Sequence, residues 1–178
     1  MSLMREGEAR EFPAEAFADV IVANEHYAAE YVAPPTSGWA SKGLAVVTCM
    51  DSRIVPLKAL GMQVGDVKIL RNAGARVTDD VMRTLVLASY LLGVDRVLIM
   101  PHTECKMASG DEADVHATIW EQHGIDTRSV EFRTVVDQMD ALRTDVARVR
   151  SSPLLPAGLV VAGAMFDMRT GRLNPVDA

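Results

Sequence analysis

The residues best suited to chemistry in this 178-residue chain are its only two cysteines, Cys49 and Cys105, together with His102. Thiolate and imidazole are donors that Zn²⁺ prefers, and three protein ligands leave a fourth position open for water. The His-x-x-Cys spacing lets one loop supply two of the ligands. The alternative is that each cysteine is a small buried apolar residue, as a single cysteine usually is. The residue types alone leave both interpretations open.

Asp51 and Arg53 form a second candidate pair, two residues beyond Cys49. A neighbouring guanidinium favours the ionised carboxylate and can bind both of its oxygens. Beside a metal, such a carboxylate would accept a hydrogen bond from the attacking nucleophile and orient it. The alternative is an ordinary loop ion pair, worth about 0–1 kcal/mol.

Alternating apolar runs and helical patterns predict the elements that must position these residues. The predicted strands cover 43–48, 67–70, 94–100 and 159–166. The predicted helices cover 13–32, 81–92, 114–122 and 135–149. This order predicts an α/β fold with a mostly parallel sheet of four to five strands and helices on both faces. Sites in such sheets lie beyond the carboxyl ends of the strands, where Cys49 and His102 fall.

Length and composition favour a single globular domain over residues 1–178, with a helical arm at about 13–33. Hydrophobic residues make up 49% of the chain and charged residues 24%. The net charge of −6 argues against nucleic acid or an anionic membrane as the main partner. No apolar run reaches the roughly 18 residues of a membrane helix, and the N-terminus lacks the apolar segment of a secretory signal. We therefore expect a cytoplasmic protein with reduced thiols.

Taken together, these motifs resemble the β-class carbonic anhydrases, and the compact chain resembles the bacterial-type subgroup. The resemblance rests on Cys49-x-Asp51-x-Arg53, on His102-x-x-Cys105 and on the intervening segment Arg71-Asn72-Ala73-Gly74. It extends from about Gly43 to the last strand and its tail. Jointly these motifs at these spacings are specific.

The resemblance implies that Cys49, His102 and Cys105 bind Zn²⁺ and that Asp51 and Arg53 form a catalytic dyad. It implies reversible hydration of CO₂ to bicarbonate, and a homodimer or homotetramer. Two arrangements of Asp51 are expected among such proteins, one paired with arginine and one bound to the metal.

Lys106 is a departure from the family pattern, because a glycine usually follows the second cysteine ligand. In the family this residue offers a backbone N–H near the substrate anion, and lysine keeps that donor. We therefore take Lys106 as a candidate substrate-binding residue. If the position requires a positive φ, the lysine costs about 1–2 kcal/mol.

Several functional questions stay open at this point. His26, His116 and His123 suit surface or capping positions better than metal ligation, and His116, His123 or buffer could carry the released proton. The N-terminal helix could cover its own sheet or extend to a neighbouring subunit. A related enzyme could act on CS₂ or COS, and a non-catalytic zinc-stabilised interaction module is a second alternative. A phosphatase or sulfurtransferase using Cys49 is disfavoured, since Asp51 would repel an anionic substrate.

Overall fold

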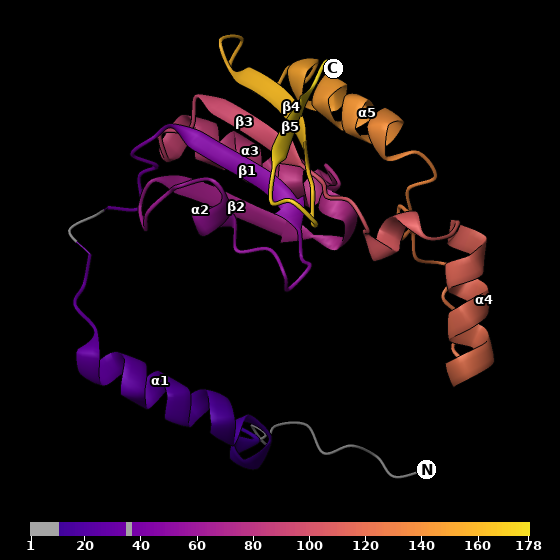
Figure 1. Ribbon diagram of the computed structural model, residues 1–178, viewed down its shortest axis with the longest axis horizontal. Helices are drawn as coiled ribbons and strands as arrows, with labels where there is room; N and C mark the ends of the chain where they lie inside the picture. The colour runs from indigo at the N-terminus through magenta and orange to yellow at the C-terminus, as the bar shows by residue number, and fades with distance from the viewer. Residues whose placement is uncertain (1–10, 35–36) are drawn as a thin grey trace, which may run out of the picture. The chain divides into compact units, whose positions relative to one another are not determined.

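Strand β1 (Leu44–Cys49) lies inside a five-stranded sheet (Figure 1). The structure is a computed structural model, and it describes residues 11–34 and 37–178. The order of the strands is β2-β1-β3-β4-β5. The other strands are β2 (Val67–Asn72), β3 (Arg96–Met100), β4 (Val160–Phe166) and β5 (Leu173–Val176). The first four strands are parallel, and β5 pairs antiparallel with β4. The predicted α/β fold with a mostly parallel sheet is confirmed.

All six residues of β1 are buried, which is why its sequence is continuously apolar rather than alternating. On one face, β1 packs against helices α3 (Asp79–Leu91) and α5 (Gln138–Arg150), which share a core cluster with Ala45 and Val47. On the other face, a smaller cluster contains Cys49 and Cys105. The short helix α2 (Pro56–Ala59) begins just after Ile54 of that cluster. The two candidate cysteine ligands therefore belong to the smaller of the two cores.

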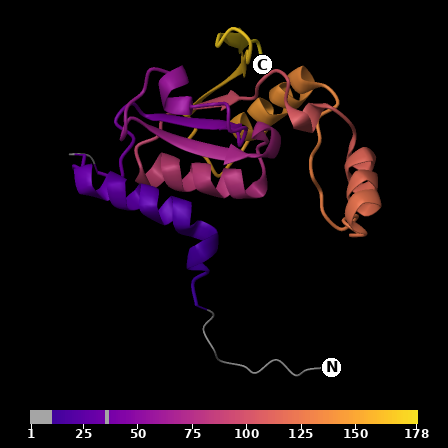
Figure 2. The same cartoon turned by 60° about the horizontal axis from the view of Figure 1, so that its bottom comes forward.

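Capping residues set the helix boundaries, which differ from the predicted ones by up to three residues. The Thr78 hydroxyl accepts a hydrogen bond from the Val81 N–H and begins α3. Asp111 caps α4 (Glu112–His123) in a capping box with Asp114. Gly124, with φ of 67°, ends α4 in the left-handed region that glycine adopts most readily. Figure 2 shows helix α4 apart from the sheet, and a long extended segment joins its C-terminal end to α5.

The N-terminal segment forms a unit of its own. It contains the short 3-10 helix η1 (Ala14–Phe17) and helix α1 (Ala18–Glu30), so the predicted helix over 13–32 forms in two pieces. No residue of α1 is buried, although it carries large apolar side chains such as Ile21 and Tyr27. Within the described ranges, none of the helices has the length and apolarity needed to cross a bilayer.

Candidate metal centre

Cys49, His102 and Cys105 come together at the carboxyl ends of β1 and β3. The two strands are parallel neighbours with Thr48 opposite Met100, so the residues that follow leave the sheet at the same edge. The potential ligand atoms of the three residues lie within 4.8 Å of one another, and the two Sγ atoms are 3.9 Å apart. All three residues are buried. This is the cluster that the spacing of the sequence predicts.

The ring of His102 is oriented so that one nitrogen is available as a ligand. Its Nδ1 lies 2.8 Å from the carbonyl oxygen of Thr103, which requires the proton to be on Nδ1. Nε2 then carries the lone pair, and it is buried without a hydrogen-bond partner among the described residues. A buried acceptor without a partner lowers the stability of the folded protein, so a cation or a hydrogen-bond donor at this atom would be stabilising.

The two thiols supply the softer part of the donor set. Burial raises the pKa of the Cys105 thiol, and the neighbouring Cys49 raises that pKa as well. A divalent cation between them would reverse this preference and hold both cysteines as thiolates. Two sulfurs and one unprotonated imidazole nitrogen therefore fit a Zn²⁺ ion.

Asp51 lies beside this cluster and is held by Arg53. The Arg53 Nε and Nη2 atoms donate to the two carboxylate oxygens at 2.9 and 2.8 Å, and its backbone N–H donates at 3.0 Å. These hydrogen bonds, the side-chain ones first, hold the pKa of Asp51 well below its usual range. The Oδ2 atom of Asp51 is 3.8 Å from Nε2 of His102. Of the two expected arrangements, the structure contains the one paired with arginine.

The same fork occurs a second time in the chain, at Asp126 and Arg128. There the Nε and Nη2 atoms donate at 2.9 and 2.7 Å, and the backbone N–H donates at 3.1 Å. An aspartate that accepts the N–H two residues ahead is a common local turn, so an Asp-x-Arg sequence can form this fork away from any metal site. What distinguishes Asp51 is its place beside His102 and the two thiols.

Further residues brace the loops that carry the candidate ligands. Arg71 donates from Nε to the carbonyl of Cys49 at 2.9 Å and from Nη2 to the carbonyl of Asp51 at 2.6 Å. Gln138 of α5 donates to the carbonyl of His102 at 2.8 Å. The sequence motif includes Arg71 without revealing this task, and no sequence signal marks Gln138.

The remaining candidates lie outside the ligand cluster. Lys106 begins the 3-10 helix η3 (Lys106–Ala108), and its φ is not positive, so the expected left-handed strain does not arise there. The positive φ in this loop belongs to Glu104, at 58°. His116 contacts the Thr127 hydroxyl at 2.8 Å, and His123 ends α4.

Comparisons with known proteins agree with this site. The family model described as "Carbonic anhydrase" matches residues 44–173. Beta-carbonic anhydrase 1 of Mycobacterium tuberculosis is 33% identical over 159 residues, which cover 89% of this chain and 96% of that protein. The crystal structure of carbonic anhydrase from Streptococcus mutans has a TM-score of 0.84 at 35% identity, covering 90% of this chain and 97% of that one.

A more distant relative carries a different name. The carbon disulfide hydrolase of Acidithiobacillus thiooxidans is 27% identical over 161 residues, covering 77% of this chain and 74% of that protein. The family model described above matches residues 44–173, a range that includes all three potential metal ligands and the Asp51–Arg53 pair. With its mostly parallel sheet, its Cys-His-Cys cluster and these matches, this chain belongs to the β-carbonic anhydrase family.

Proposed function

We propose that this enzyme catalyses the zinc-dependent, reversible hydration of CO₂ to bicarbonate and a proton. Cys49, His102 and Cys105 would bind Zn²⁺, and Asp51 and Arg53 would form the catalytic dyad. The observation that carries the proposal is the buried Nε2 of His102, which has no hydrogen-bond partner within residues 11–34 and 37–178 and lies near the two thiols, with the Asp51 carboxylate 3.8 Å away.

The dyad has a defined task in this reaction. When bound, zinc lowers the pKa of a water molecule and supplies hydroxide near neutral pH. Asp51, kept ionised by Arg53, can only accept a hydrogen bond. Asp51 would therefore accept a hydrogen bond from the nucleophile, and this would direct a lone pair of the nucleophile at CO₂. Arg53 occupies both carboxylate oxygens and so would keep Asp51 from becoming a metal ligand itself. The backbone N–H of Lys106 would donate to the bicarbonate anion.

CS₂ or COS is the second candidate substrate, because a relative at 27% identity is named a carbon disulfide hydrolase. The test is stopped-flow CO₂ hydration on zinc-quantified protein, with release of H₂S from CS₂ measured on the same sample. We expect turnover of CO₂ to exceed turnover of CS₂. Faster release of H₂S would show that CS₂ is the better substrate. Absence of both activities in protein that holds one zinc per chain would favour a non-catalytic zinc module.

We also propose that the enzyme works as a homodimer or homotetramer, with residues 13–33 as an arm. One feature supports this: no residue of α1 is buried, although the helix carries large apolar side chains such as Ile21 and Tyr27. Light scattering that gave a fully active 19.3 kDa monomer would contradict this proposal.

Thiolate ligands require reduced cysteines, so we place the enzyme in the cytoplasm. Fractionation of cells that express the full chain, followed by antibody detection, tests this location. Recovery of the protein outside the cytoplasmic fraction would contradict it.

A further inference from the structure

Glu104 stands between two potential metal ligands in an unusual backbone conformation. Its φ of 58° lies in the left-handed region, which few residues other than glycine, asparagine and aspartate adopt. It occupies the loop that runs from His102 to Cys105. A glutamate at such a position suggests that its side chain performs a task that glycine cannot.

The Glu104 carboxylate is anchored by the hairpin that joins β4 to β5. Its Oε1 atom accepts a hydrogen bond from Nε of Arg169 at 2.5 Å. Asp167 shapes this hairpin by accepting the backbone N–H groups of Arg169 and Thr170 at 2.8 and 3.0 Å. The hairpin is fixed to the ligand loop a second time, because the N–H of Met168 donates to the Thr103 hydroxyl at 3.0 Å.

On its other side, Glu104 faces Arg53 of the dyad. Nη2 of Arg53 donates to the carbonyl of Glu104 at 3.4 Å, and Nη1 lies 3.9 Å from the second carboxylate oxygen. With both Asp51 and Glu104 in contact, the side chain of Arg53 is still 51% exposed. An exposed arginine has considerable rotamer freedom, and a second contact on its outer edge restricts that freedom.

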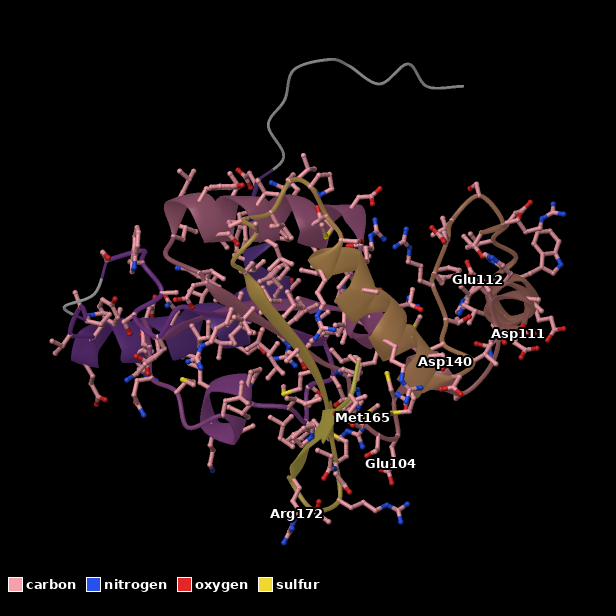
Figure 3. All side chains as sticks on the ribbon, turned by 90° about the horizontal axis from the view of Figure 1, so that it is seen from above. Glu104, Asp111, Glu112, Asp140, Met165 and Arg172 are labelled. Atoms are coloured by element: carbon pink, nitrogen blue, oxygen red, sulfur yellow. The ribbon has the colours of Figure 1, made fainter. Side chains whose placement is uncertain are left out.

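We propose that Glu104 is a positioning residue for the dyad. Anchored by Arg169, it holds the outer edge of the Arg53 guanidinium, so that Nε and Nη2 stay in place on the two oxygens of Asp51. The catalytic consequence rests on the proposed function, whereas the positioning itself is a property of the folded chain. Figure 3 shows Glu104 at the end of the sheet where the hairpin turns, with Arg172 on the same hairpin.

A purely structural task for Glu104 predicts a different outcome. If Glu104 only completes the turn, Glu104→Gly should serve as well or better, because glycine adopts φ near 58° without strain. If the carboxylate matters, both Glu104→Gly and Glu104→Gln should loosen Arg53. Arg169→Met removes the anchor without changing the ligand loop, and Arg169→Lys restores the charge. Arg172→Met is the matched control, since Arg172 has no ion pair among the described residues.

The experiment uses the full chain labelled with ¹⁵N-arginine and measures water exchange of the Arg53 Nε–H signal, assigned by Arg53→Lys. We expect exchange to rise about fivefold in Glu104→Gln, Glu104→Gly and Arg169→Met. A fivefold change is the largest effect usually seen when one exposed ion pair is lost. Arg169→Lys should recover part of the protection, and Arg172→Met should match the parent.

In Glu104→Gln, Glu104→Gly and Arg169→Met, kcat should fall about threefold to fivefold. KM should stay nearly unchanged and each chain should retain one zinc, because only the dyad is loosened. Parent-like Arg53 exchange in Arg169→Met or in Glu104→Gly would overturn the positioning role. If the exchange changes as expected while the zinc-loaded parent does not hydrate CO₂, the proposed function fails and the positioning role stands.

Discussion

At the scale of single residues, Asp51 and Asp126 show that an identical ion pair can have two different meanings. Each aspartate is held by the arginine two residues ahead through the same three hydrogen bonds. Only Asp51 lies beside the histidine nitrogen and the thiols of the candidate metal centre. The chain therefore contains its own control for the dyad.

Replacing Asp51 by alanine should lower kcat/KM by about a hundredfold or more while one zinc is retained, because the nucleophile loses the group that orients it. Asp126→Ala should change kcat/KM by less than about twofold, as an exposed ion pair contributes little. Stopped-flow hydration with metal analysis of both variants checks this. Equal activities would show that the pair at Asp51 is an ordinary loop ion pair.

His102→Ala should remove zinc and activity together, because loss of one of three protein ligands leaves two thiolates that cannot complete the site. His116→Ala is the matched control and should keep one zinc per chain. Elemental analysis of freshly purified protein decides the matter. A zinc-free parent that is folded and active would refute the metal site.

Lys106→Gly should keep zinc and leave kcat/KM within about twofold, since the useful group is a backbone N–H and φ at this position is not positive. The measurement is again CO₂ hydration on zinc-quantified protein. A large loss of rate would show that the lysine side chain takes part in binding the anion.

At the scale of elements, local patterns made much of the fold predictable, and the remaining features depend on contacts between distant segments. The valine-rich runs and the capping residues place four strands and the four longer helices, and the strand ends place Cys49 and His102; the short helix α2 was not predicted. β5 is four exposed or half-buried residues that include Pro175, so it gives little signal. The contact of Gln138 with His102 joins residues 36 positions apart, which no local pattern marks.

The packing of α5 on β4 leads to a stability prediction at Gly163. A Cβ at this position would lie 3.0 Å from two atoms of Leu142 and 3.1 Å from Val146. Gly163→Ala should lower the free energy of unfolding by about 1–3 kcal/mol through overpacking. Gly158→Ala, with nothing within 4 Å of its Cβ, should stay within about 0.5 kcal/mol of the parent. Urea unfolding measures both, and equal midpoints would contradict the tight packing.

At the scale of the whole molecule, stability should decrease in acid, partly because of Asp66 and Asp167. The N–H of Gln63 and the Ser41 hydroxyl lower the pKa of Asp66 below its ordinary 3.8, and the N–H groups of Thr170 and Arg169 lower that of Asp167. A carboxylate with a lowered pKa stabilises the fold above its unfolded pKa, and this contribution disappears as pH falls through the folded pKa.

Replacing both aspartates by asparagine should therefore reduce the loss of unfolding free energy between about pH 5 and pH 2. Urea unfolding of parent and variant at each pH tests this, and the comparison cancels effects that both share, such as metal loss. An identical pH dependence in the two proteins would show that these hydrogen bonds do not contribute to acid stability.

The burial of β1 on both faces also has a consequence for hydrogen exchange. Its N–H groups are enclosed by parallel neighbours on either side, and the Thr48 hydroxyl adds a bond to the carbonyl of Met100 at 2.8 Å. We expect no local opening to expose such amides, so they should exchange with solvent only when the domain unfolds. α4 has no buried residue, and its amides can exchange by fraying. The slowest deuterium uptake in β1 therefore measures the global unfolding equilibrium of residues 37–178.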